Sequence, residues 1–105
     1  MTLENSVALV TGAGRGIGKA IALMLAREGA TIVLTARTVA ELEQVKKEIE
    51  ATGGSALVVR ADLSKDADIE KLFGDISSRF NRFDILVNNA GLGLFAPVRD
   101  LSISD

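Results

Sequence analysis

The chain has 105 residues, of which 48% are hydrophobic and 25% are charged, as is usual for a globular protein. Its formal net charge of −2 gives no electrostatic reason to expect nucleic acid or an anionic membrane as a partner, and no apolar run approaches the ~18 residues that cross a bilayer. Cysteine and histidine are absent and the first residues do not form a signal peptide, so we expect a cytoplasmic protein without disulfides or a metal site.

The first predicted elements are a short strand and an amphipathic helix. Val7–Val10 is a continuous apolar run, which is typical of a strand buried on both faces of a parallel sheet. After a glycine-rich stretch, apolar residues recur with helical spacing until Gly29, which favours the end of a helix. The expected apolar stripe of this helix comprises Ile17, Ile21, Met24 and Leu25.

A second strand and helix follow. Thr31–Thr35 is rich in β-branched residues and predicts a strand. Thr38 and Glu41 match the capping box S/T-x-x-E, so Thr38 is expected to cap a helix that ends before Gly53. The expected apolar face of this helix comprises Leu42, Val45 and Ile49.

The pattern repeats once more and ends with a fourth strand. Strands are predicted at Ala56–Val59 and Asp84–Val87, and Ser64 is the expected N-cap of the helix between them. No further periodic pattern follows Gly91. The expected inner face of this helix comprises Ile69, Leu72, Phe73, Ile76 and Phe80.

The order of these elements predicts the fold class. Strands that alternate with helices in the order βαβαβαβ indicate an α/β protein of the Rossmann type, with a parallel sheet and right-handed crossovers. No linker or low-complexity stretch interrupts the order. Residues 1–105 are therefore expected to belong to a single domain.

A glycine-rich turn joins the first predicted strand to the first predicted helix. The segment reads Thr-Gly-Ala-Gly-Arg-Gly-Ile-Gly over Thr11–Gly18. A helix N-terminus offers unpaired backbone N–H groups and positive dipole charge to a phosphate, and glycines let the backbone approach it closely. The turn therefore predicts a phosphate-binding site.

The spacing of the glycines distinguishes between nucleotide-binding motifs. A P-loop is rejected because its first glycine would fall on Ala13 and its magnesium-binding hydroxyl on Ala20. The common form G-x-G-x-x-G also fails, because its last glycine would fall on Ile17. The spacing fits T-G-x-x-x-G-x-G and thus resembles the short-chain dehydrogenase/reductase family, through Gly12, Gly16 and Gly18.

The end of the second strand bears on the choice of cofactor. An acidic residue there would hydrogen-bond the ribose 2′-hydroxyl of NAD, whereas an arginine accommodates the 2′-phosphate of NADP. This chain has Ala36 where the acid would stand, followed by Arg37. Arg15 in the glycine turn adds a second cation, and guanidinium groups bind phosphate bidentately. We therefore expect NADP(H) to be preferred over NAD(H).

Two further segments match the family in place and order. Asp62 and Leu63 resemble the family's acid and its neighbour, which contact the adenine ring. A role of Asp62 as a turn or capping residue is the alternative, and the binding role is favoured. Asn88–Gly91 resembles the family's N-N-A-G motif, which lines the cofactor site with backbone. The nearest resemblance within the family is to 3-oxoacyl-carrier-protein reductases. The predicted cofactor-binding residues are Gly12, Arg15, Gly16, Ile17, Gly18, Arg37, Asp62, Leu63, Asn89, Ala90 and Gly91.

The resemblance also implies that residues 1–105 form the N-terminal, NAD(P)-binding part of a single Rossmann-type domain and lack its C-terminal catalytic part. The family's catalytic residues are a serine and a Tyr-x-x-x-Lys motif, and this chain contains no tyrosine. We therefore predict no catalytic residues here and no reductase activity for this chain alone. By the family's topology the strand order would be 3-2-1-4, which makes the domain an incomplete doubly wound one. The fourth strand would then be an exposed edge through which chains could associate.

Three functional hypotheses follow. In the first, the chain is part of an oxidoreductase whose longer parent transfers hydride between NADP(H) and a small carbonyl or alcohol substrate. In the second, it is a stand-alone nucleotide-binding module. In the third, another chain completes it across the edge of the fourth strand.

Overall fold

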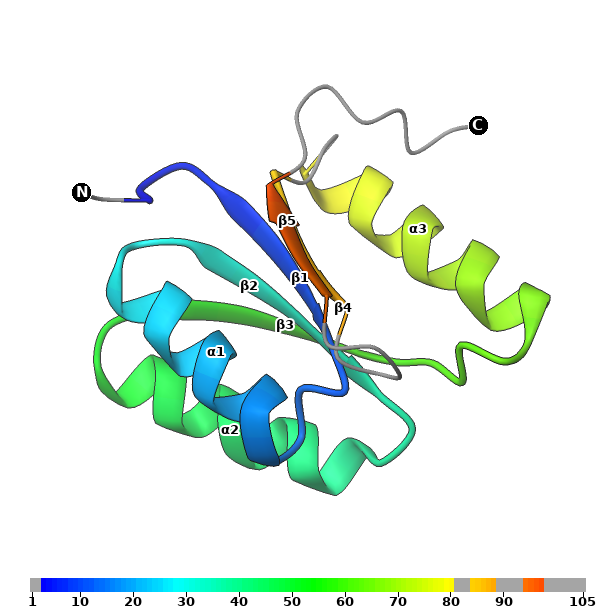
Figure 1. Cartoon of the computed structure of the whole chain (residues 1–105), viewed down its shortest axis with the longest axis horizontal. Helices are drawn as coiled ribbons and strands as arrows, with labels where there is room; N and C mark the ends of the chain where they lie inside the picture. The colour runs from blue at the N-terminus through cyan, green and yellow to red at the C-terminus, as the bar shows by residue number, and fades with distance from the viewer. Residues whose placement is uncertain (1–2, 81–83, 89–93, 98–105) are drawn as a thin grey trace.

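The computed structural model describes residues 3–80, 84–88 and 94–97. These residues form one sheet with the strand order β3-β2-β1-β4-β5 and three helices (Figure 1). The first four strands are parallel and alternate with the helices, which confirms the predicted Rossmann-type α/β fold. In chain order the elements are β1 (Val7–Thr11), α1 (Gly16–Arg27), β2 (Thr31–Ala36), α2 (Val39–Ala51), β3 (Ser55–Arg60), α3 (Asp66–Phe80), β4 (Ile85–Asn88) and β5 (Leu94–Pro97).

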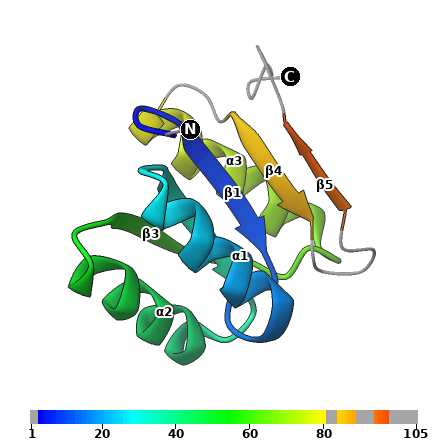
Figure 2. The ribbon, with the colours of Figure 1, turned by 60° about the vertical axis from the view of Figure 1, so that its left-hand side comes forward.

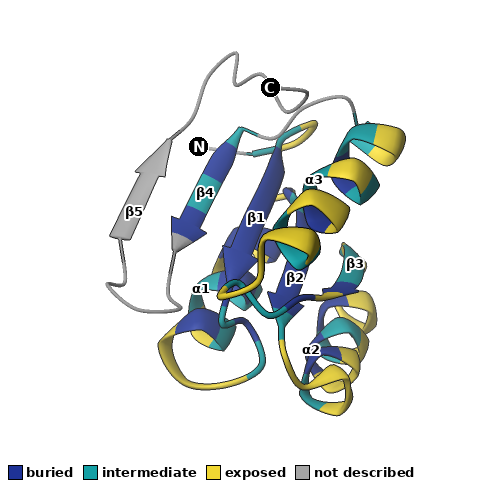
Figure 3. Cartoon of the chain, turned by 90° about the vertical axis from the view of Figure 1, so that its right-hand side faces the viewer, coloured by how far each residue is buried: buried dark blue, intermediate teal, exposed yellow. Residues whose placement is uncertain are grey.

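The helices lie on both faces of the sheet. Helices α1 and α2 cover one face, and α3 covers the other (Figures 1 and 2). This arrangement is expected when right-handed crossovers run first from β1 to β3 and then back to β4. β1 is buried along its whole length, because β2 and β4 flank it and helices cover both of its faces (Figure 3).

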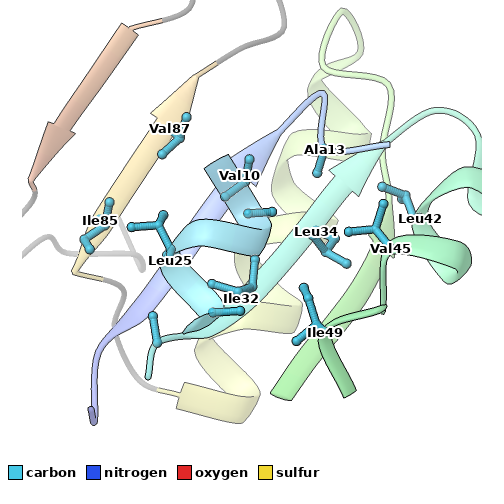
Figure 4. Close-up of a cluster of buried hydrophobic side chains, with 14 residues drawn as sticks. Val10, Ala13, Leu25, Ile32, Leu34, Leu42, Val45, Ile49, Ile85 and Val87 are labelled. Carbon is cyan, nitrogen blue, oxygen red and sulfur yellow. The ribbon is translucent and has the colours of Figure 1, made fainter. Parts of the chain in front are cut away.

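The core is divided by the sheet into two clusters of apolar side chains. On the face of α1 and α2, alternate strand residues such as Val10 and Ile32 pack against helix residues such as Leu42 and Ile49 (Figure 4). On the face of α3, Leu9 and Val33 pack against Leu72 and Ile76. The predicted apolar faces of α2 and α3 are thus confirmed at their buried positions, while Ile69, Phe73 and Phe80 of α3 are half-buried.

The predicted apolar stripe of α1 is partly wrong. Ile17 and Met24 are 69% and 53% exposed, and Leu25 is the only large side chain of the predicted stripe that is fully buried. Small residues at every fourth position form the inner face instead, because they allow the helix backbone to lie close to the sheet. The buried residues of α1 are Gly18, Ala22, Leu25 and Ala26.

The two predicted N-cap residues, Thr38 and Ser64, do not cap their helices as expected. Thr38 stands at the N-cap of α2, but its side chain makes no capping hydrogen bond. Helix α3 begins at Asp66, so Ser64 is not its cap. Ser64 instead donates hydrogen bonds from its backbone N–H and its hydroxyl to Asp62 Oδ1, at 3.0 and 2.6 Å. At the start of α3, this turn of Asp62 and Ser64 takes the place of the expected cap.

The fourth strand is not an edge, contrary to the sequence-based expectation. Strand β5 pairs with β4 in antiparallel register, from Ile85 opposite Pro97 to Asn88 opposite Leu94. A short strand that ends in proline is suited to an edge, where the missing N–H leaves no gap in the ladder. Self-association through an open β4 edge therefore loses its structural basis.

Candidate functional site

Three loops meet at the carboxyl ends of β1, β2 and β3. The backbone N–H of Ala13, in the glycine turn, donates to the carbonyl oxygen of Thr35 at 3.2 Å. On the other side of β2, the N–H of Ala61 donates to the carbonyl oxygen of Ala36 at 3.0 Å. The glycine turn and the loop after β3 are therefore fixed against the end of β2. In parallel α/β sheets, ligands bind at this end of the strands.

The glycines of the turn have different structural roles. Gly12 and Gly16 have φ angles of 61° and 62°, in the left-handed region that favours glycine. A Cβ atom built on Gly16 would meet no described atom within 4 Å, so the backbone is open to a ligand there. Gly18 is buried on the inner face of α1. The turn thus combines a tight bend, an open backbone and a close approach of helix to sheet.

The N-terminus of α1 is available to an anion. The helix begins at Gly16, and the extended N-cap residue Arg15 makes no side-chain capping hydrogen bond. No acidic residue lies in the first turn of the helix. The first N–H groups of a helix have no partner within it, and together with the helix dipole they favour a phosphate group. Gly16, Ile17 and Gly18 therefore fit a pyrophosphate.

Arg15, in the glycine turn, lies close to the start of α2. Its Nε atom is 3.9 Å from Glu41 Oε2, in the first turn of α2. The side chain of Arg15 is 86% exposed, whereas that of Glu41 is 37% exposed. Arg37 is also exposed and immediately precedes the N-cap residue Thr38. The two predicted phosphate-binding arginines thus both border the N-terminal end of α2.

Asp62 is held in a hydrogen-bonded turn after β3. Hydrogen bonds from the hydroxyl and the backbone N–H of Ser64 lower the pKa of the Asp62 carboxyl below its ordinary value. Partial desolvation opposes this shift, whereas the positive charges of Lys65 and Arg37 reinforce it. The backbone N–H of Asp62 donates to Asp68 Oδ2 at 2.8 Å. Asp62 is therefore an ionised acceptor close enough to Arg37 to feel its charge.

Two threonines at the strand ends are not among the predicted cofactor-binding residues. Thr11 and Thr35 are both buried and lie opposite one another in the register of β1 and β2. Thr11 Oγ1 donates to the carbonyl oxygen of Val87 at 3.3 Å, which links β1 to β4. Thr35 Oγ1 has no hydrogen-bond partner in the described part of the chain. Only the strand register, which the sequence pattern does not give, identifies them as neighbours.

The remaining predicted site residues are placed as follows. Leu63 is half-buried against the core of the α3 face. Asn89, Ala90 and Gly91 lie outside the described residues, although Asn88 just before them pairs with Thr11 across β1 and β4. Within the ranges 3–80, 84–88 and 94–97, no group of three potential metal ligands comes together. In the same part of the chain, no helix is long and apolar enough to traverse a membrane.

Comparison with known proteins gives consistent matches over nearly the whole chain. The sequence model of the family described as "short chain dehydrogenase" matches residues 6–105. A hydroxynaphthalene reductase-like protein Arp2 of Metarhizium anisopliae is 40% identical over 105 residues, which are 99% of this chain and 39% of that protein. The short chain dehydrogenase/reductase nsrJ of Aspergillus novofumigatus is 44% identical over 101 residues, covering 95% of this chain and 38% of its own length.

Solved structures show the same likeness. A metagenomic short-chain oxidoreductase in complex with NADP is 47% identical, with a TM-score of 0.84, over 88% of this chain and 42% of that one. A hydroxysteroid dehydrogenase from Escherichia coli is 38% identical, with a TM-score of 0.82, over 86% of this chain and 37% of that one. The chain thus spans about two fifths of the length of the proteins it matches.

Proposed function

Because the chain belongs to the short-chain dehydrogenase family, we propose that its glycine turn and the adjoining loops bind NADP(H) in preference to NAD(H). The observation that carries this proposal is the uncapped N-terminus of α1, where Gly16 leaves the backbone open and Arg15 adds a cation. The binding of a nicotinamide dinucleotide by members of this fold supports it, as does the NADP complex of the metagenomic relative.

In this proposal each segment of the site contacts a different part of the cofactor. The backbone N–H groups of Gly16, Ile17 and Gly18 would bind the pyrophosphate, with the tight turn at Gly12 bringing them into position. Asp62, which is ionised at neutral pH, would accept a hydrogen bond from the adenine amino group, with Leu63 beside it. The family resemblance extends the site to Asn89, Ala90 and Gly91.

The preference for NADP(H) rests on the charges at the end of β2. Ala36 provides no carboxylate to bind a ribose 2′-hydroxyl or to repel a 2′-phosphate. Arg37 and Arg15 both border the N-terminal end of α2, where their guanidinium groups could bind that phosphate bidentately.

The activity of the longer protein is part of the same proposal. The bound cofactor would supply hydride to, or accept it from, a small carbonyl or alcohol substrate. Residues 1–105 contain neither tyrosine nor histidine, so they offer no acid of the family's type to protonate the substrate oxygen. We propose that they bind the cofactor and do not by themselves reduce a carbonyl. Carbonyl-dependent oxidation of NADPH by the purified chain would contradict this.

The test is to titrate NADP⁺ and NAD⁺ into the purified protein and to follow binding and the melting temperature. A ligand that binds the folded state raises its melting temperature. We expect NADP⁺ to bind more tightly than NAD⁺, and Arg37→Ala to remove most of this difference. Arg27→Ala is the matched control, because Arg27 is exposed in the last turn of α1, away from the glycine turn. A protein that melts cooperatively but binds neither cofactor would refute the proposal.

A further inference from the structure

The carboxylate of Glu41 lies directly over the glycine turn. A Cβ atom built on Gly14 would lie 2.9 Å from both Glu41 Cβ and Glu41 Oε1. Glu41 also approaches Arg15, with 3.9 Å between Nε and Oε2. The sequence predicts only a capping role for this residue, but Thr38 makes no side-chain cap and Glu41 points to the loop instead.

The two partners of this ion pair differ in how firmly they are held. Glu41 belongs to a helix and is packed against Gly14, so its carboxylate has little freedom. Arg15 is 86% exposed and makes a single long contact rather than a bidentate one. An exposed pair of this kind is weak, at about 0–1 kcal/mol. The negative charge is therefore the fixed partner, and the arginine is the one that can reorient.

We propose that Glu41 is a specificity-determining residue that competes with the 2′-phosphate of NADP(H) for the guanidinium group of Arg15. This inference rests on the proposed function, in which Arg15 binds that phosphate. A guanidinium that contacts Glu41 must be shared with the phosphate or released to it, and either process costs binding free energy. NAD(H) has no phosphate at this position, so Glu41 lowers the affinity for NADP(H) alone.

The experiment compares Glu41→Gln with the wild-type protein by isothermal titration with NADP⁺ and NAD⁺. Glutamine keeps the length and packing of the side chain and removes its charge. We expect the Kd for NADP⁺ to fall by about threefold to tenfold, as one charge acting over several ångströms near a protein surface allows. The Kd for NAD⁺ should stay within a factor of about two. Glu43→Gln is the matched control, since Glu43 is exposed on the same helix.

A second comparison tests whether the effect runs through Arg15. If Glu41 occupies the guanidinium, Arg15→Ala weakens NADP⁺ binding by a larger factor in the Glu41→Gln background than in the wild-type protein. Equal factors in the two backgrounds, or an unchanged ratio of the two Kd values in Glu41→Gln, would overturn the inference. If the folded wild-type protein shows no preference for NADP⁺, the proposed cofactor preference fails and this inference fails with it. If the wild type prefers NADP⁺ and Glu41→Gln does not alter that preference, the inference alone fails.

Discussion

The two faces of the sheet differ in how many helices cover them and in the size of the apolar core that lies on each. Among the residues whose burial the structure describes, the core on the face of α1 and α2 has 14 buried residues, whereas the core on the face of α3 has seven. Half-buried apolar side chains border both cores, and on the α3 face they include two phenylalanines, Phe73 and Phe80. Ala13 of the glycine turn belongs to the larger core, which therefore lies directly beneath that turn (Figures 1 and 4). A site held within fractions of an ångström needs such rigid support.

The largest expected effect compares one leucine from each face. Leu42 of α2 is fully buried in the first core, and Leu72 of α3 is almost fully buried in the second. Replacement by alanine costs about 2–5 kcal/mol, and the cost is lower where the surroundings can collapse into the cavity. We expect Leu42→Ala near the upper end of this range and Leu72→Ala near the lower end, measured by urea denaturation. A larger loss for Leu72→Ala would reverse the comparison of the two faces.

Two glycines allow the effect of backbone conformation on stability to be measured separately from the effect of packing. A Cβ atom on Gly16 of α1 or on Gly74 of α3 would meet no described atom within 4 Å. Gly16, however, has a φ angle of 62°, where a side chain costs roughly 1–2 kcal/mol. Gly16→Ala should therefore reduce the free energy of unfolding and weaken cofactor binding. Gly74→Ala should raise that free energy by up to about 1 kcal/mol, because alanine favours a helix.

Calorimetric unfolding and cofactor titration of Gly16→Ala and Gly74→Ala test these two predictions. Loss of binding in Gly16→Ala with unchanged binding in Gly74→Ala would locate the effect at the turn. If the two substitutions change stability in the same direction, backbone conformation is not what distinguishes these sites.

Replacing the two buried threonines at the ends of β1 and β2 should give a smaller difference in stability. Thr35→Val removes a buried hydroxyl that has no partner in the described residues, so it should stabilise the protein by about 1 kcal/mol. Thr11→Val removes the hydrogen bond to Val87 and should destabilise it by roughly 0.5–1.5 kcal/mol. Thermal unfolding of both variants tests this. Destabilisation by Thr35→Val would show that its hydroxyl does have a partner in solution.

The sequence predicted the first four strands, the inner face of α2 and the place of the glycine turn between β1 and α1, because these depend on local patterns. The short apolar runs, the helical spacing in α2 and the glycine spacing are readable one segment at a time. The inner face of α1 was predicted only at Leu25, because the close approach of its small residues to the sheet outweighs the size of Ile17 and Met24. Strand β5 was missed because four residues ending in Pro97 carry no periodic signal, and only pairing with β4 defines them.

For the site, the sequence names candidate residues but not the contacts between them. Arg15, Arg37 and Asp62 follow from the motif and from the ends of predicted strands. The position of Glu41 over Gly14 depends on the angle between α2 and the glycine turn, which no local pattern encodes. The turn formed by Asp62 and Ser64 depends likewise on where α3 begins.

The smallest expected effect concerns the turn formed by Asp62 and Ser64, which connects the binding end of the sheet to α3. Ser64→Ala removes the hydroxyl that contributes most to lowering the pKa of Asp62, so this pKa should rise toward its ordinary value. A carboxyl whose pKa is lower in the folded state stabilises the protein above its unfolded pKa, and this contribution is lost as the pH falls through the folded value. Stability of the wild type and of Ser64→Ala should therefore differ at neutral pH and converge in acid. An NMR titration of the Asp62 carboxyl carbon measures the shift, with Ser78→Ala on α3 as the control. An unchanged pKa in Ser64→Ala would mean that the turn opens in solution and that Asp62 is free to meet a ligand without losing Ser64.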